Sequence, residues 1–158
     1  MRLISRERLV KDSVFFLVAA AVTGLDQLSK YLIRSNMYPG QSIPEDGFFR
    51  IVYGTNPGGV FGLFANQTFL ITIAAVISVV IILLYSRHKM AQSLLVRVSL
   101  GLVLGGSVGN LIDRVRFGEV TDFIRMGSWP VFNLADAAID VGIVLLLYYV
   151  IFKMRKGE

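Results

Sequence analysis

The chain has 158 residues, of which 54% are hydrophobic, and a mean hydropathy of +0.64, values that exclude an ordinary soluble domain. It has no cysteine and a single histidine, His88, which leaves no thiol nucleophile and argues against a Ser–His–Asp triad or a histidine-rich metal site. The net charge of +5 falls mostly at the ends of apolar runs, a distribution that fits membrane topology better than nucleic-acid binding.

Four apolar runs are each long enough to cross a membrane as a helix, which takes roughly 20 residues. They cover residues 13–33, 68–85, 94–112 and 131–152. The first run follows basic residues, as the apolar part of a cleavable signal peptide does. Its apolar pattern resumes after Asp26, however, so we expect a transmembrane helix that is retained and not cleaved. The sequence predicts an all-α membrane protein with four transmembrane helices in a single domain over residues 1–158.

Lysine and arginine are distributed unequally between the two sides of these spans. Ten of the sixteen lie in the N-terminal tail, in the region 86–97 and in the C-terminal tail. The positive-inside rule therefore predicts that both termini are cytoplasmic. Residues 34–67 and 113–130 then face outward.

The outer segment 34–67 is long for a connection between two helices. Turn signals occur at 39–40, 44 and 46–47, and the stretch FFRIVYG (48–54) between them and the next span has the aromatic and β-branched residues of a strand. We expect a small extracytoplasmic β-structure that lies on the membrane.

Polar residues collect at the predicted outer face of the spans. Ionisable groups at membrane depth are expensive and usually face the bundle interior or a cavity, so a shared level suggests a shared site. The residues concerned are Asp26, Lys30, Asn56, Asn110, Asp113, Arg114, Asp122, Asn133 and Asp136.

Each of these residues also has a purely structural interpretation. Asp26 and Lys30, at i and i+4, can form an ion pair on one helix face. Asn133 can cap the last helix with Asp136 at its third position. Asp113 and Arg114 can pair at the interface, and Asn56 can be a turn residue. The small-residue ridge of the third span is typical of helix packing; it consists of Gly101, Gly105 and Gly109.

The functional interpretation is a pair of carboxylates that hydrolyses a peptide at the membrane surface. Two carboxyl groups in one site cannot both ionise easily, so one keeps a proton while the other acts as general base on a water molecule. This chemistry needs no metal, cysteine or histidine. The residues alone leave the pair open among four candidates: Asp113, Asp122, Asp136 and Asp140.

Four blocks of the sequence resemble the lipoprotein signal peptidases, also called signal peptidase II. They are DQLSKYLI (26–33), NPGGVFG (56–62), GGSVGNLIDRVRFGEVTDFI (105–124) and FNLADAAI (132–139). They occur in the family's order and spacing, and the resemblance covers nearly the whole chain.

The resemblance implies an aspartic endopeptidase whose catalytic dyad falls on Asp122 and Asp136. It implies that the enzyme uses no cofactor and no metal. The implied substrates are prolipoproteins whose signal-peptide cysteine carries a diacylglyceryl group, cut just before that cysteine. The family is inhibited by the cyclic peptide globomycin, has an outer β-cradle and is found in the bacterial cytoplasmic (inner) membrane, with the active site near the outer face. Its remaining site positions fall on Asp26, Lys30, Asn56, Gly58, Asn110, Asp113, Arg114 and Asn133.

Two positions depart from the family pattern. The second block usually reads Asn-x-Gly-Ala-Ala, whereas residues 56–60 here read Asn-Pro-Gly-Gly-Val. Asp140 stands where the family more often has a small hydroxyl residue, so it inherits no catalytic role. We expect Asp140 to face the bundle interior, paired with Lys30 or hydrogen-bonded.

Two other classes of protein fit parts of the pattern. A non-enzymatic membrane carrier or assembly factor would use intramembrane aspartates and Lys30 as an ion or proton path, with polar residues spread through the membrane depth. A metal-dependent membrane hydrolase would use the carboxylates as ligands and would lose activity on chelation.

Overall fold

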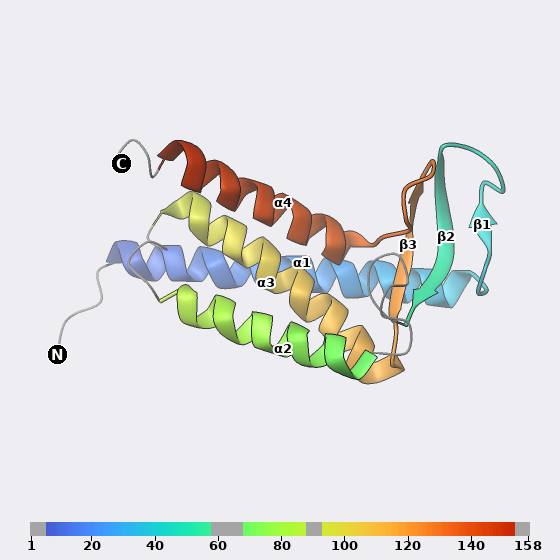
Figure 1. Cartoon of the computed structure of the whole chain (residues 1–158), viewed down its shortest axis with the longest axis horizontal. Helices are drawn as coiled ribbons and strands as arrows, with labels where there is room; N and C mark the ends of the chain where they lie inside the picture. The colour runs from blue at the N-terminus through green and yellow to red at the C-terminus, as the bar shows by residue number, and fades with distance from the viewer. Residues whose placement is uncertain (1–5, 58–67, 88–92, 154–158) are drawn as a thin grey trace.

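The computed structural model describes residues 6–57, 68–87 and 93–153. Helices α1 (Arg6–Asn36), α2 (Thr68–Tyr85), α3 (Leu94–Phe117) and α4 (Leu134–Tyr148) run along a common axis, and a small sheet lies at one end of them (Figure 1). A π-helical turn, η3 (Tyr149–Lys153), continues α4. The start of α1 and the end of η3 lie together at the end of the bundle away from the sheet. We call the two ends the sheet end and the opposite end.

All four predicted spans are helices long and apolar enough to cross a membrane. Their predicted bounds need correction at the sheet end. Helix α3 continues beyond residue 112 to Phe117, because its last turns carry Arg114 and Arg116, which suit the negative end of a helix dipole. Helix α4 begins at Leu134 and not at 131, because Asn133 caps it.

Helix α3 is the centre of the bundle and packs against the other three helices. A Cβ atom at Gly101 would lie 2.8 Å from the carbonyl oxygen of Phe15, and one at Gly105 would lie 2.6 Å from that of Ala19. Larger residues at these two positions would therefore push α1 away. The predicted role of the glycine ridge in helix packing is confirmed.

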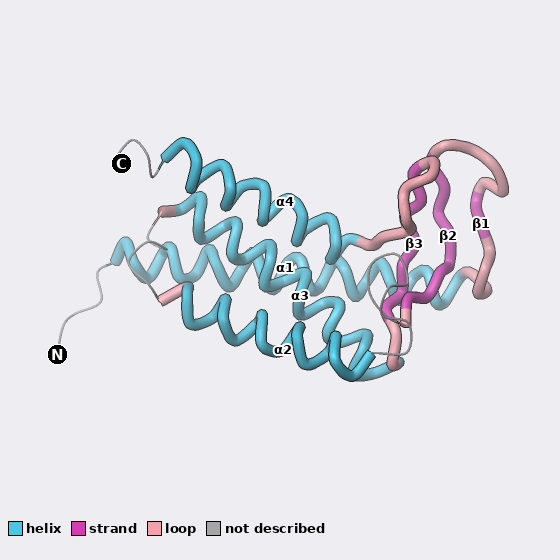
Figure 2. The backbone as a smooth tube through the Cα atoms, in the orientation of Figure 1, coloured by secondary structure: helices cyan, strands magenta, loops and turns pink. Residues whose placement is uncertain are grey.

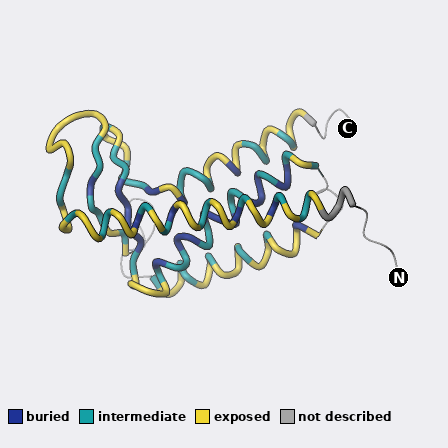
Figure 3. The backbone as a smooth tube through the Cα atoms, turned by 180° about the vertical axis from the view of Figure 1, so that it is seen from behind, coloured by how far each residue is buried: buried dark blue, intermediate teal, exposed yellow. Residues whose placement is uncertain are grey.

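The outer surface of the bundle is apolar. Helix α2 has no buried residue, and Phe69 and Leu84 are 74% and 69% exposed. Figure 3 shows exposed positions along the outside of the helices, with buried ones concentrated on α3. Apolar side chains that face outward in this way are what lipid contact requires.

The sheet is antiparallel, with strand order β1-β2-β3 (Figure 2). Its strands are β1 (Ser42–Ile43), β2 (Phe49–Asn56) and β3 (Val120–Met126). The strand predicted at 48–54 is β2, whereas the other two strands were not predicted. Strand β3 leaves α3 through Gly118, whose φ of 78° favours glycine, and Asp122 pairs with Gly54 on β2. The short turn at Gly118 thus brings Asp122 back beside the end of the bundle.

Candidate active site

The predicted polar residues of the described chain come together at the sheet end. They belong to α1, β2, α3, β3 and α4, whereas α2 and β1 contribute none of them. Helix α1 provides Asp26 and Lys30, strand β2 provides Asn56, and α3 provides Asn110, Asp113 and Arg114. Strand β3 provides Asp122, and the start of α4 provides Asn133 and Asp136. Gly58, the remaining predicted site residue, lies outside the described residues.

Asn133 and Asp136 form a capping box at the start of α4. The Asn133 side-chain oxygen accepts a hydrogen bond from the Asp136 backbone N–H (2.9 Å), and the Asn133 backbone N–H donates to Asp136 Oδ2 (3.2 Å). The structural interpretation of these two residues is therefore confirmed. It does not exclude a functional one, because the box holds the Asp136 carboxylate in a fixed place at the helix N-terminus.

The same asparagine reaches the second carboxyl group. Asn133 Nδ2 donates to Asp122 Oδ1 at 2.7 Å, and Asn56 Nδ2 lies 3.3 Å from Asp122 Oδ2. Asn133 is fully buried and Asp122 is 5% exposed. One amide side chain therefore links the strand that carries Asp122 to the helix that carries Asp136.

Asp122 is held in an environment that favours its protonated form. Burial, and to a smaller extent the nearby charge of Asp136, raise its pKa from 3.8 to about 7. Hydrogen bonds from Asn133 and Asn56, together with the charge of Lys30, oppose the rise. A carboxyl group with this pKa exchanges its proton near neutral pH.

Asn110 fixes the other side of Asp136. Its Nδ2 donates to Asp136 Oδ1 (2.8 Å), while its Oδ1 accepts from Lys30 Nζ (2.9 Å) and from Asn133 Nδ2 (3.2 Å). Because Lys30 can only donate, it sets the orientation of the amide and directs its N–H₂ group toward Asp136. Lys30 thus acts on Asp136 through Asn110.

The predicted Asp26–Lys30 pair is present and fully buried. Lys30 Nζ lies 2.9 Å from Asp26 Oδ2 and 3.5 Å from Asp113 Oδ2. Asp26 Oδ1 also accepts from the Ala135 backbone N–H (3.0 Å). The ion pair therefore joins α1 both to α3 and to the first turn of α4.

Asp113 is also fully buried, and it connects α3 to β3. Its Oδ2 accepts from the Thr121 backbone N–H at 3.0 Å, next to Asp122. The suggested Asp113–Arg114 pair does not form a direct contact, because the ion-pair and hydrogen-bond partners of Asp113 in the described chain are on α1 and β3. Adjacent helical residues point about 100° apart, so they do not face each other.

Three residues of the network were not identified from the sequence. Gln27 donates to Asp113 Oδ1 (3.0 Å), and Arg34 donates to Thr121 Oγ1 (2.8 Å). Arg34 also lies 3.5 Å from Asp113 Oδ2. The spacing of Asp26, Lys30 and Arg34 at i, i+4 and i+8 offered a signal for Arg34, whereas Gln27 and Thr121 gave none.

Asp140 does not lie where we expected it. It is exposed, and it forms no ion pair or hydrogen bond with the described residues; Lys30 is occupied by Asp26, Asn110 and Asp113. The expectation that it faces the bundle interior is wrong. The buried face of α4 carries Ala135 and Gly142, which pack on α3, and Asp140 is about 140° or more around the helix from both.

Comparison with known proteins identifies the family. Residues 18–152 match the family model described as signal peptidase (SPase) II. A lipoprotein signal peptidase of Moorella thermoacetica is 48% identical over 145 residues, which covers 91% of this chain and 95% of that protein. A lipoprotein signal peptidase of Dehalococcoides mccartyi is 41% identical, with 95% and 97% covered.

The fold also matches solved structures. Two structures described as bacterial membrane enzymes superpose with TM-scores of 0.85 and 0.81, each at 29% sequence identity. The first covers 92% of both chains, and the second covers 89% of this chain and 94% of the other. The helices and the sheet are therefore arranged as in those enzymes.

Proposed function

This chain belongs to the lipoprotein signal peptidase (signal peptidase II) family, and we propose that it is an aspartic endopeptidase whose catalytic pair is Asp122 and Asp136. Family membership makes it a multi-pass membrane peptidase that processes lipoprotein signal peptides. The observation that carries the aspartic mechanism is the Asn133 side chain. Asn133 donates to Asp122 Oδ1 from this side chain and to Asp136 Oδ2 from its backbone N–H, so the two carboxyl groups share one buried partner.

We assign the resting proton to Asp122 and the charge to Asp136. Asp122 has a pKa raised to about 7 by burial and by the charge of Asp136. Asp136 accepts hydrogen bonds from Asn110 and from the Asn133 backbone, so its oxygens are held as acceptors. This division gives one acid and one base in the same site.

The reaction then follows from these protonation states. Asp136 takes a proton from a water molecule, and the resulting hydroxide attacks the scissile carbonyl carbon. Asp122 donates a hydrogen bond to the carbonyl oxygen and stabilises the negative charge of the tetrahedral intermediate. When the C–N bond breaks, the proton on Asp136 passes to the leaving amine, and both carboxyl groups return to their starting states.

The remaining polar residues position this pair. Lys30 orients Asn110, Asp26 holds the first turn of α4 through the Ala135 N–H, and Asp113 holds β3 through the Thr121 N–H. Buried contacts of this kind hold both carboxyl groups without using loops. We infer that Asn56, Gly58 and Arg114 complete the substrate-binding side, as in the family's pattern.

The proposed substrate is a prolipoprotein with a diacylglyceryl group on its signal-peptide cysteine, cut just before that cysteine. The site lies at one end of an apolar bundle, so a signal helix and acyl chains can stay in the bilayer while the scissile bond reaches the carboxyl groups. The distribution of lysine and arginine supports a cytoplasmic-membrane protein with both termini cytoplasmic and the site near the outer face. Globomycin is the expected inhibitor.

The test compares purified Asp122→Asn and Asp136→Asn with Asp46→Asn, a control at an exposed carboxylate in the outer loop. Cleavage of a lipidated prolipoprotein is measured by gel shift and by mass of the released peptide. We expect each dyad variant to lose activity by about 10³-fold or more with an unchanged unfolding temperature, and Asp46→Asn to keep it. Full activity in either dyad variant would overturn the assignment.

Two further measurements separate the rival classes. Cleavage that survives treatment with a metal chelator excludes a metal-dependent hydrolase, whereas loss restored by added metal would support it. Ion or proton transport by the protein in liposomes, without cleavage, would support a carrier. Against a carrier, the buried polar residues of α1 lie at the sheet end and are not spread along the described helix.

A further inference from the structure

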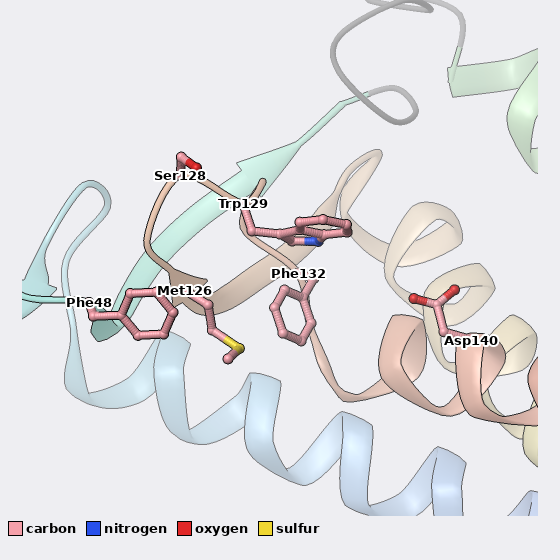
Figure 4. A pocket seen from close by; sticks show the side chains of 6 residues that line it. All are labelled: Phe48, Met126, Ser128, Trp129, Phe132 and Asp140. Atoms are coloured by element: carbon pink, nitrogen blue, oxygen red, sulfur yellow. The ribbon is translucent and has the colours of Figure 1, made fainter.

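A cavity of about 510 Å³ lies between the edge of the sheet and the first turns of α4 (Figure 4). The sheet, the β3–α4 connection and α4 all contribute to its wall. It is separate from the hydrogen-bonded network of the proposed active site, although Phe132 and Asp140 of its wall flank Asn133 and Asp136 in sequence. Its lining residues are Phe48, Met126, Ser128, Trp129, Phe132 and Asp140.

The wall of this cavity combines aromatic rings with one carboxylate. Figure 4 shows Trp129 and Phe132 between Phe48 on one side and Asp140 on the other. Asp140 is the one formally charged residue of the lining, and it has no ion pair or hydrogen bond within the described chain. Aromatic faces and an unpaired carboxylate together favour an organic cation.

The position of Asp140 makes an unpaired charge costly. It lies one helical turn beyond Asp136, or about 6 Å further along α4. Beyond it α4 exposes Val141 and Val144, which are 52% and 62% exposed and suit contact with hydrocarbon. A carboxylate at the border of hydrocarbon is stabilised by a cation that reaches the same level.

We propose that this cavity binds the primary ammonium head group of a phospholipid, such as phosphatidylethanolamine, from the adjoining membrane leaflet. The ammonium group pairs with the Asp140 carboxylate and contacts the faces of Trp129 and Phe132. The acyl chains lie along the exposed apolar residues of α4. Ser128, the other polar residue of the wall, is available to donate to the lipid phosphate.

A lipid fits this cavity better than the two other sources of positive charge. A divalent metal ion requires several oxygen ligands, and Asp140 is the one acidic residue of the wall. A basic side chain of a substrate would have to leave its charge at the hydrocarbon border with no apolar group to occupy the adjacent face of α4. A phospholipid carries the cation and the apolar chains in one molecule.

The experiment reconstitutes the full-length protein in nanodiscs with equal amounts of phosphatidylethanolamine and phosphatidylglycerol of matched chains. Native mass spectrometry then identifies the lipids that remain bound. We expect the wild-type protein to retain the ethanolamine lipid preferentially, and Asp140→Asn to reduce that preference by about tenfold. Trp129→Leu should reduce it less, and the control Asp46→Asn should leave it unchanged.

Lipid binding at Asp140 does not require peptidase activity, so the same measurement is made with Asp136→Asn. A preserved lipid preference in that variant supports the lipid site, whether or not Asp136 proves to be catalytic. Equal retention of the two lipids by the wild-type protein, or an unchanged preference in Asp140→Asn, would overturn the proposal. So would a result in which Asp140→Asn keeps the lipid preference but slows only those substrates that carry lysine near the cut.

Discussion

The two ends of the bundle are stabilised in different ways. At the opposite end, Phe15, Ala19, Val96, Leu100 and Leu104 form an apolar core. At the sheet end a cluster of buried charged and polar groups is joined by ion pairs and hydrogen bonds from α1 to β3 and α4, beside a few buried apolar residues of the sheet. One short chain thus contains an apolar packing region and a polar positioning region on the same helices.

The opposite end is not purely apolar, because it also contains one buried charged residue. Arg97 is 1% exposed and its Nη2 lies 2.7 Å from Asp12 Oδ1, without the geometry of a hydrogen bond. The Asp12 side chain is 34% exposed, so this pair retains access to the surroundings. Lys30 and its two carboxylate partners have none. A fully buried network is expensive, which is the reason to expect that it serves chemistry more than stability.

The largest effect is expected from Lys30→Met, compared with Arg97→Met at the opposite end. The Lys30 variant leaves Asp26 buried without its cation and Asp113 with Arg34 alone, which should destabilise the protein by about 4 kcal/mol. It should also abolish cleavage, because Asn110 loses its orientation. Thermal unfolding in detergent and a cleavage assay measure both. Arg97→Met should lose less stability and keep its activity; equal losses in the two variants would remove the distinction between the ends.

The second largest effect, on stability, is expected from Phe15→Ala in the apolar core. Phe15 is fully buried, so the cavity should cost about 3 kcal/mol of unfolding free energy. Cleavage at a temperature where the variant is folded should remain near the wild-type rate. A large loss of kcat under those conditions would show that the opposite end takes part in the chemistry.

Asn133→Ala should have the opposite effect to Phe15→Ala: a large loss of cleavage activity and a small loss of stability. Loss of the side chain removes the donor to Asp122 and the cap of α4, so kcat should fall by about a hundredfold while stability falls by only about 1 kcal/mol. Steady-state cleavage kinetics and thermal unfolding give the two numbers. Asn133→Ser, which can still cap the helix, should recover stability but not kcat, and recovery of both would contradict the role of the amide.

The smallest effect is the pH dependence. Because Asp122 must be protonated and its pKa is raised to about 7, kcat/KM should fall about tenfold per pH unit above that value. Stability should fall as pH rises from about 4 to 7, since the unfolded chain releases this proton before the folded one does. Asp122→Asn should flatten the stability curve. A pH–rate profile without an alkaline limb would contradict the assigned proton.

Much of the local structure was accessible from the sequence. Hydropathy predicted the four helices, the composition of 48–54 predicted β2, and Asn133 with Asp136 predicted the cap of α4. These features depend on residues within one segment, so pattern and spacing are sufficient. The glycine ridge is of the same kind, because any helix that packs closely on α3 needs small residues there.

Other features depended on contacts between segments. The residues alone left four candidate aspartates, and only the family resemblance selected Asp122 and Asp136. Their link through Asn133 exists because Gly118 turns β3 back beside α4. Strand β3 itself was missed, since its buried residues can be recognised only once β2 lies beside them.

Asp140 is the clearest example of a residue whose environment could not be predicted from the sequence. Length, hydropathy and capping are local properties, so the amino-acid pattern was sufficient to predict α4 as an apolar helix of membrane-spanning length with Asp136 in its first turn. The rotation of this helix about its axis depends instead on how it packs against α3. Ala135 and Gly142 allow close packing on α3, and that contact turns Asp140 outward, away from Lys30 and into the aromatic cavity.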